Sequence, residues 1–245
     1  MTELKRLYIL DFGLFQVKAS QRTIGIPGFL IQTQDGRNIL VDSGFPPWYV
    51  GDTAAVSRAE GLDAFGEILK LEPENLPTAQ LERCGVKPAE IDFFVLTHSH
   101  IDHVGGLHAF PRARLVLGAR ERQLERPLYW NNLPRLDWPA NECQRIETDT
   151  HLCDGLELLV TPGHSPGHLS LLLELPETGA VLLTGDAINR ASEPSEGFAG
   201  AWDEGQAEKS AKRLIELALE RQAWIVYGHD PAQWATLKKA PAFYA

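Results

Sequence analysis

Short apolar runs alternate with turn residues over the first part of the chain. Apolar stretches of strand length occupy residues 7–10, 28–33 and 38–42, and Asp35-Gly36 stands between the last two. An Asp-Gly pair between two apolar runs is a typical signal of a β-hairpin. The pattern therefore predicts that the chain begins with antiparallel strands.

Apolar runs of similar length return after residue 90. They predict strands at 92–97, 114–118, 156–160, 169–175, 181–184 and 223–226. Residues 45–80, between the two groups of runs, lack this pattern, and we expect no strand there.

The clearest helix is predicted at 204–221, where apolar residues recur at spacings of three and four: Ala207, Ala211, Leu214, Ile215 and Ala218. Shorter helices are predicted around 64–69, near 119–125, and from Thr78, which would cap a helix that Gly85 ends. Two packed sheets with helices outside them are the simplest α/β architecture for this alternation.

No linker rich in glycine and serine or in charge divides residues 1–245, so we expect a single domain. Two aromatic insertions, near 45–70 and 127–142, interrupt the predicted elements. Their rings belong to Trp48, Tyr49, Phe65, Tyr129, Trp130 and Trp138. These rings either wall an apolar pocket, or only pack over a sheet edge or form the contact of a homodimer.

The composition of the chain argues against some classes of binding partner. The formal net charge is −10 and the arginines and lysines form no basic stripe, which argues against nucleic acid. No segment has membrane-spanning length and no signal-peptide core follows the first residues, so we expect a cytoplasmic protein without membrane contact. Cys84, Cys143 and Cys153 are irregularly spaced, and we expect reduced, mostly buried thiols.

Three histidines and an aspartate lie within six residues, directly after the apolar run that ends at Leu96. The stretch reads His98-Ser99-His100-Ile101-Asp102-His103. Neutral imidazole nitrogens and carboxylate oxygens are the ligands that borderline divalent metals prefer. Because a strand just before the loop can hold it rigidly, this spacing indicates a metal site.

Three more potential ligands stand in the same position, just after an apolar run. They are His164 in Thr161-Pro162-Gly163-His164, Asp186 after Gly185, and His229 after Gly228. Side chains at the carboxyl ends of several strands converge at one edge of a layered α/β fold. We therefore expect these residues to join the 98–103 loop in one site.

These motifs resemble those of the metallo-β-lactamase superfamily, and in particular its branch of N-acyl-homoserine lactonases. The matching motifs are Val41-Asp42-Ser43-Gly44, the H-x-H-x-D-H loop, Thr161-Pro162-Gly163-His164, Gly185-Asp186 and Gly228-His229. The resemblance to the branch rests on chain length and on the segments 161–170, 183–187 and 228–230. It implies an αβ/βα four-layer sandwich.

The resemblance also implies two divalent metal ions held by seven side chains. The first ion would be bound by His98, His100 and His164, the second by Asp102, His103 and His229, and Asp186 would bridge the two. Zinc is the expected metal, and manganese, iron and cobalt are alternatives that such a ligand set accepts.

Two neighbouring residues would support these ligands. His168 lies four residues after His164 and is expected to be structural, because it cannot bind the same ion without displacing His164. Asp42 resembles the superfamily aspartate that orients a ligand histidine.

The implied reaction is the opening of a lactone ring, with an N-acyl homoserine lactone or a related small lactone as substrate. A hydroxide shared by the two metals would attack the carbonyl, and Asp186 would keep the metals close together. Asp102 would lie on the leaving-group side, where it can pass a proton. Asn189 departs from the branch, which commonly has a tyrosine three residues after the bridging aspartate. Its amide either donates a hydrogen bond to the substrate carbonyl or only caps a turn.

Two other functions stay open from the sequence. A thioesterase of the glyoxalase II kind shares the metal ligands, but that family usually has basic residues near its C-terminus, where this chain has only Lys238-Lys239. A metal-binding module without catalysis is the other alternative, although a complete dinuclear site is rarely built for storage. Metal analysis combined with assays on lactones and thioesters would separate the three.

Overall fold

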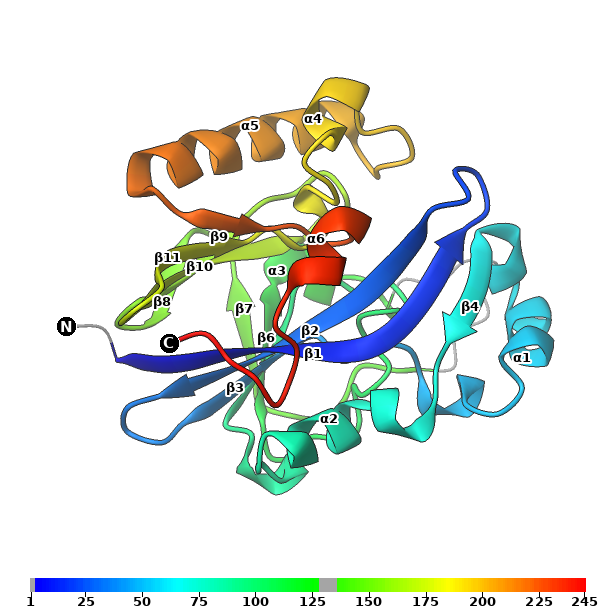
Figure 1. Ribbon diagram of the computed structural model, residues 1–245, viewed down its shortest axis with the longest axis horizontal. Coiled ribbons are helices and arrows are strands. Elements are labelled where there is room, and N and C mark those ends of the chain that lie inside the picture. The colour runs from blue at the N-terminus through cyan, green and yellow to red at the C-terminus, as the bar shows by residue number, and fades with distance from the viewer. Residues whose placement is uncertain (1–2, 128–135) are drawn as a thin grey trace.

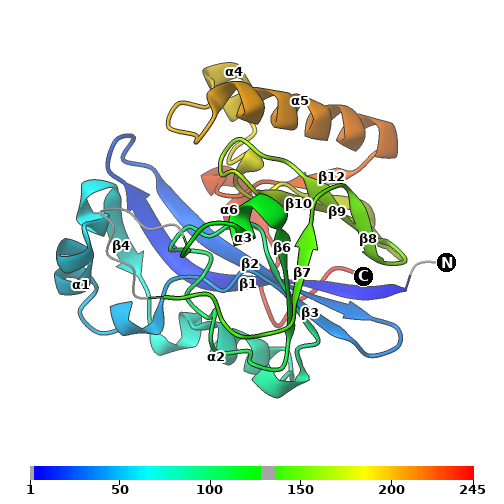
Figure 2. The same ribbon diagram turned by 180° about the vertical axis from the view of Figure 1, so that it is seen from behind.

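Two β-sheets packed face to face form the centre of the molecule (Figure 1 and Figure 2). The computed structural model describes residues 3–127 and 136–245. The first sheet has the strand order β4 (Gly66–Lys70), β1 (Leu4–Val17), β2 (Thr23–Thr33), β3 (Asn38–Val41), β5 (Phe93–Leu96), β6 (Arg114–Gly118) and β7 (Cys143–Ile146). The second has the order β12 (Trp224–Val226), β11 (Gly179–Leu183), β10 (Leu169–Leu175), β9 (Leu156–Val160) and β8 (Thr150–Cys153).

Helices lie outside both sheets. Figure 1 shows α4 (Glu193–Glu196) and α5 (Glu204–Arg221) over the second sheet, and α1 (Thr53–Glu60) and α2 (Pro77–Arg83) on the opposite side, with the first sheet. Two short helices, α3 (Ala119–Arg122) and α6 (Pro231–Thr236), follow β6 and β12. Single 3₁₀ turns occupy Pro47–Tyr49, Leu62–Ala64, Pro73–Asn75, Pro88–Glu90 and Gly185–Ala187. Within the described ranges, every helix is too short or too polar to span a membrane.

Three apolar clusters fill the spaces between these layers. Ile9, Val95 and Leu171 belong to the cluster between the two sheets. Leu172 faces the opposite way from Leu171 and packs with Leu214 of α5. Because β10 is buried on both faces, leucines stand on both of them, and only Ser170 and Glu174 interrupt its apolar sequence. The order helix, sheet, sheet, helix is the predicted four-layer arrangement.

Most of the predicted elements are confirmed. The strands at 114–118, 156–160 and 169–175 and the helix at 204–221 have the predicted bounds. Antiparallel pairing of β1 with β2 and of β2 with β3 confirms the start of the chain, and Gly36 adopts a positive φ of 91° in the Asp-Gly turn. The charged helix near 119–125 is limited to the four residues of α3.

The predicted helix around 64–69 is wrong, as is the expectation that 45–80 holds no strand. Residues 66–70 form β4, an edge strand that pairs antiparallel with the extended end of β1. Ile68 is buried while Glu67 and Leu69 are exposed, which is the alternation of a strand with one covered face. A run this short does not distinguish a strand from a helix by its period.

Two smaller expectations are also wrong. Leu76, not Thr78, occupies the position before α2, whose first residue is Pro77. Proline suits that place because it has no N–H that would need a partner. The three cysteines are free but only partly buried, so they are less enclosed than predicted.

Candidate metal centre

Loops from both sheets meet at the carboxyl ends of β5, β9, β11 and β12. The N–H of Leu169 donates to the carbonyl of Thr97 across the two sheets, at 2.9 Å. A Cβ atom on Gly228 would lie only 2.5 Å from the carbonyl oxygen of Gly185, so the loops after β11 and β12 touch. The predicted ligands are therefore brought together, although the chain positions span from 98 to 229.

His98, His100 and His164 form a first cluster. The Nδ1 atom of His100 lies 3.0 Å from His98 Nε2 and 3.0 Å from His164 Nε2. Asp102, His103 and His229 form a second cluster, in which Asp102 Oδ2 lies 3.6 Å from the Nε2 atom of each histidine. These are the two groups that the resemblance implies.

Asp186 lies between the two clusters. Its Oδ2 atom is 3.3 Å from His164 Nε2 and 3.9 Å from His98 Nε2. Its Oδ1 atom faces the second cluster, at 3.3 Å from His229 Nε2 and 3.6 Å from His103 Nε2. One carboxylate thus presents a different oxygen to each group, as a bridging ligand does.

The spacing of these atoms fits metal ligation. Four ligands at 2.0–2.1 Å from a tetrahedral ion lie about 3.3 Å from one another. The contacts among these side chains, between 3.0 and 3.9 Å, lie on either side of that value. In the described part of the chain, His103 Nε2 and Asp186 Oδ1 are buried without a hydrogen-bond partner. Such atoms are costly to bury, and a shared cation would satisfy both.

Hydrogen bonds at the opposite ring nitrogens fix the orientation of the histidines. His103 Nδ1 lies 2.9 Å from Asp42 Oδ2, and His229 Nδ1 lies 2.9 Å from the carbonyl of Gly25. These contacts leave both Nε2 atoms facing the site. A partner of this kind fixes the tautomer and ring angle of a ligand histidine. The expected contact of Asp42 with a candidate ligand is confirmed.

The two clusters differ in their electrostatics. Burial holds the pKa of His98 and His164 well below the usual histidine value and lowers that of His100, so all three are neutral at pH 7. Burial also opposes charge on His103 and His229. The surrounding carboxylates outweigh it and raise the pKa to about 10 for His103 and about 9 for His229. The first cluster thus offers neutral ligands, while the second strongly attracts positive charge.

A family model, described as the metallo-beta-lactamase superfamily, matches residues 26–229. The chain belongs to the metallo-beta-lactamase superfamily. The match spans the whole set of predicted ligands, from His98 to His229, and confirms the resemblance seen in the motifs. It also confirms the fold class of the four-layer sandwich.

Curated relatives within this superfamily match over nearly the full chain. An N-acyl homoserine lactonase of Bacillus cereus is 34% identical over 98% of both chains. The N-acyl homoserine lactonase AttM of Rhizobium radiobacter is 30% identical over 100% of both. A solved N-acyl homoserine lactone hydrolase, with the product N-hexanoyl-L-homoserine at its catalytic metal centre, covers 100% of both chains with a TM-score of 0.83 and 31% identity.

His168 lies beside the candidate ligands, and its two ring nitrogens contact other groups of the protein. Its Nδ1 atom lies 2.9 Å from Thr161 Oγ1, and its Nε2 atom accepts a hydrogen bond from the N–H of Asp186 at 3.0 Å. Both ring nitrogens therefore have hydrogen-bond partners within the protein. This agrees with the structural role expected for His168. His108 and His151, which match no motif, are exposed.

Asn189, at the position of the branch tyrosine, holds the segment that follows Asp186. Its Nδ2 atom donates to Glu193 Oε1 at 3.3 Å and to the Asp186 carbonyl at 3.5 Å. Its N–H donates to Glu193 Oε2. This arrangement favours the turn-holding alternative, and contact with substrate stays a prediction.

We expect Asn189→Ala to reduce stability more than catalysis. Loss of the hydrogen bonds to Glu193 and the Asp186 carbonyl should destabilise the fold by about 1–2 kcal/mol. Thermal unfolding should show this loss, while kcat/KM for a lactone should change by less than about threefold. A 3- to 30-fold loss of kcat with an unchanged Tm would instead assign the amide to the substrate carbonyl, on the scale of an oxyanion donor whose charge a metal shares.

Trp48 and Tyr49, both in the first aromatic insertion, have different surroundings. Trp48 lines an apolar cavity of about 340 Å³ beside Gly105 and Gly106, just after the 98–103 loop. Tyr49 is fully buried, and its hydroxyl donates to Glu60 at 2.7 Å, so it is a packing residue. Tyr129 and Trp130 lie outside the described residues.

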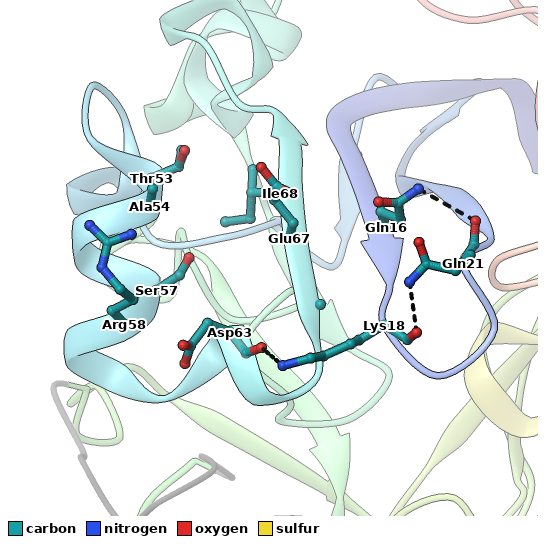
Figure 3. A pocket seen from close by; sticks show the side chains of 11 residues that line it. Gln16, Lys18, Gln21, Thr53, Ala54, Ser57, Arg58, Asp63, Glu67 and Ile68 are labelled. Atoms are coloured by element: carbon teal, nitrogen blue, oxygen red, sulfur yellow. Dashed lines mark hydrogen bonds between the residues drawn. The ribbon is translucent and has the colours of Figure 1, made fainter.

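A second cavity, of about 500 Å³, lies between α1, β4 and the turn joining β1 to β2 (Figure 3). Its walls carry charged side chains of both signs: Lys18, Arg58, Asp63 and Glu67. Figure 3 shows the amine of Lys18 pointing to the carbonyl of Asp63, a hydrogen bond of 3.2 Å. None of the seven candidate ligands lines this cavity.

One buried residue at the site was not singled out from the sequence. Glu121 is 0% exposed, and its carboxylate accepts hydrogen bonds from two loops that carry candidate ligands. In the sequence it stands between Arg120 and Arg122 in a charged stretch, which gives no sign that one side chain turns inward.

Proposed function

We propose that the protein is an N-acyl homoserine lactonase that uses two divalent metal ions. The observation that carries this proposal is the pair of ligand clusters, buried or partly buried, that share Asp186. Full-length similarity to N-acyl homoserine lactonases of 30–34% identity supports lactones as the substrate class.

The first ion would be held by His98, His100 and His164, and the second by Asp102, His103 and His229, with Asp186 bridging them. When bound, two such ions polarise the substrate carbonyl and supply a nucleophile at neutral pH. Zinc is the proposed metal, since imidazole nitrogen and carboxylate oxygen are among its usual ligands, and manganese, iron and cobalt are the alternatives.

Asp186 and Asp102 would have different roles in the reaction. Asp186 lies at the centre, where it fixes the separation of the two clusters and offsets positive charge. Asp102 is more accessible than Asp186, with 16% of its side chain exposed against 8%. A carboxylate at the open side of the site can pass a proton to the leaving oxygen as the ring opens.

The test is a substrate panel assayed with metal-reconstituted protein. We expect kcat/KM for N-acyl homoserine lactones to exceed that for thioesters, phosphodiesters and β-lactams by about tenfold or more. Metal-stripped protein serves as the control and should be inactive on every member. Preference for a glutathione thioester would favour the glyoxalase II alternative, and metal binding without hydrolysis would favour the non-catalytic one.

Cytoplasmic location and a homodimer are further proposals. Fractionation of the source cells would test the location, and light scattering of the purified protein would test the dimer.

A further inference from the structure

Glu121 reaches from α3 into the space between two ligand-bearing loops. Its Oε1 atom accepts hydrogen bonds from the N–H of Ser99 at 2.9 Å and from Ser99 Oγ at 2.6 Å. Its Oε2 atom accepts from Ser165 Oγ at 3.0 Å and from the N–H of Gly167 at 3.0 Å. Each carboxylate oxygen thus binds a different loop.

The two loops are those that carry the first cluster. Ser99 lies between His98 and His100, and Ser165 directly follows His164. The contacts that hold the second cluster are different, since Asp42 and the Gly25 carbonyl orient its histidines. The 98–103 loop also carries Asp102 and His103 of the second cluster, but only the first cluster takes a ligand, His164, from the loop of Ser165. The separation that Glu121 sets between the two loops therefore bears on the first of the two proposed metal positions.

The packing leaves this carboxylate little freedom. A Cβ atom on Gly167 would lie 2.2 Å from the backbone nitrogen of Glu121, and one on Gly118 would lie 2.0 Å from the carbonyl oxygen of Gly167. The backbone of α3 and the 163–168 loop are thus in direct contact. Burial of an ionised carboxylate is unfavourable unless hydrogen bonds compensate it, and here four donors do so.

We propose that Glu121 is a positioning residue for the first metal position. It would hold the Ser99 and Ser165 loops at the separation at which His98, His100 and His164 share one ion. This inference rests on the proposed dinuclear centre. Glu121 would act through the loops, without contact with substrate.

The test measures metal affinity at each position separately. We expect His229→Ala to impair the second position and leave the first, and His164→Ala to do the reverse. In the His229→Ala background, we expect Glu121→Gln to weaken zinc binding by roughly 10- to 100-fold, the scale of supporting contacts around a metal. In the His164→Ala background the same change should alter affinity by less than about threefold. Competition with a chromophoric chelator measures both, and the visible spectrum of bound cobalt reports altered geometry.

Glu60→Gln is the matched control. Glu60 is also a buried carboxylate, 3% exposed, and accepts hydrogen bonds from Trp48 and Tyr49. Its amide variant should reduce Tm and leave zinc affinity unchanged in both backgrounds. An equal loss at the two positions after Glu121→Gln, or a loss of Tm without a change in affinity, would overturn the positioning role.

A second variant tests the same proposal if Glu121→Gln does not fold. Ser165→Ala removes one of the four hydrogen bonds, so we expect a loss of roughly 2- to 10-fold in zinc affinity in the His229→Ala background. Unchanged affinity there would overturn the proposal. Wild-type protein that binds fewer than two ions would overturn the dinuclear centre itself, which separates the two failures.

Discussion

The change of Asp186 to asparagine is expected to weaken the binding of both metal ions and to reduce kcat/KM for lactones by on the order of 10³-fold or more. Asparagine keeps the size of the side chain but removes its charge and one of its two acceptor oxygens. Those oxygens face different clusters, Oδ2 toward His164 and Oδ1 toward His229. Both metal positions should therefore be affected together.

Elemental analysis and steady-state kinetics would measure this result. Asp203→Asn is the matched control, because Asp203 caps the start of α5 through the N–H of Gln206 and lies outside the ligand set. That variant should keep two ions per chain and lose at most about 1 kcal/mol of stability. If Asp186→Asn still bound two ions, or lost only one, Asp186 would not be the bridge.

Long periodic segments of this chain could be predicted because their pattern is local. The helix at 204–221 repeats its apolar residues from Ala207 to Ala218, and its bounds are confirmed. In contrast, β4 exists because β1 extends far enough to pair with it, which only the tertiary arrangement determines. Its five residues, Gly66–Lys70, carry too few positions to reveal a period.

The candidate ligands could also be proposed from the sequence, since each stands just after an apolar run. The shared superfamily motifs then suggested how to divide them between two ions. The contacts that support the candidate ligands were harder to predict from the sequence. The contacts of Glu121 and Asn189 depend on the direction in which each side chain points in a short helix or turn. No local sequence pattern indicates that direction.

His164 and His168 offer the sharpest test of the ligand assignment, because both are histidines of one short loop. His164→Ala should leave one ion per chain and reduce kcat/KM by roughly 10²- to 10³-fold, since the first cluster loses one of its three histidines. His168→Ala should keep two ions at saturating metal. That variant leaves the Asp186 N–H and the Thr161 hydroxyl short of a partner and opens a cavity in the core.

The cost of the His168 change should appear as lost stability. A buried donor without a partner and the new cavity together should lower the free energy of unfolding by roughly 2–4 kcal/mol. For a domain of this size, that loss corresponds to a fall in Tm of about 5–10 °C. Metal content and Tm thus separate the two variants: His164→Ala loses an ion, and His168→Ala loses stability. If His168→Ala lost the ion while His164→Ala kept both, the ligand would be His168, and the hydrogen bonds of its ring would have to rearrange on metal binding.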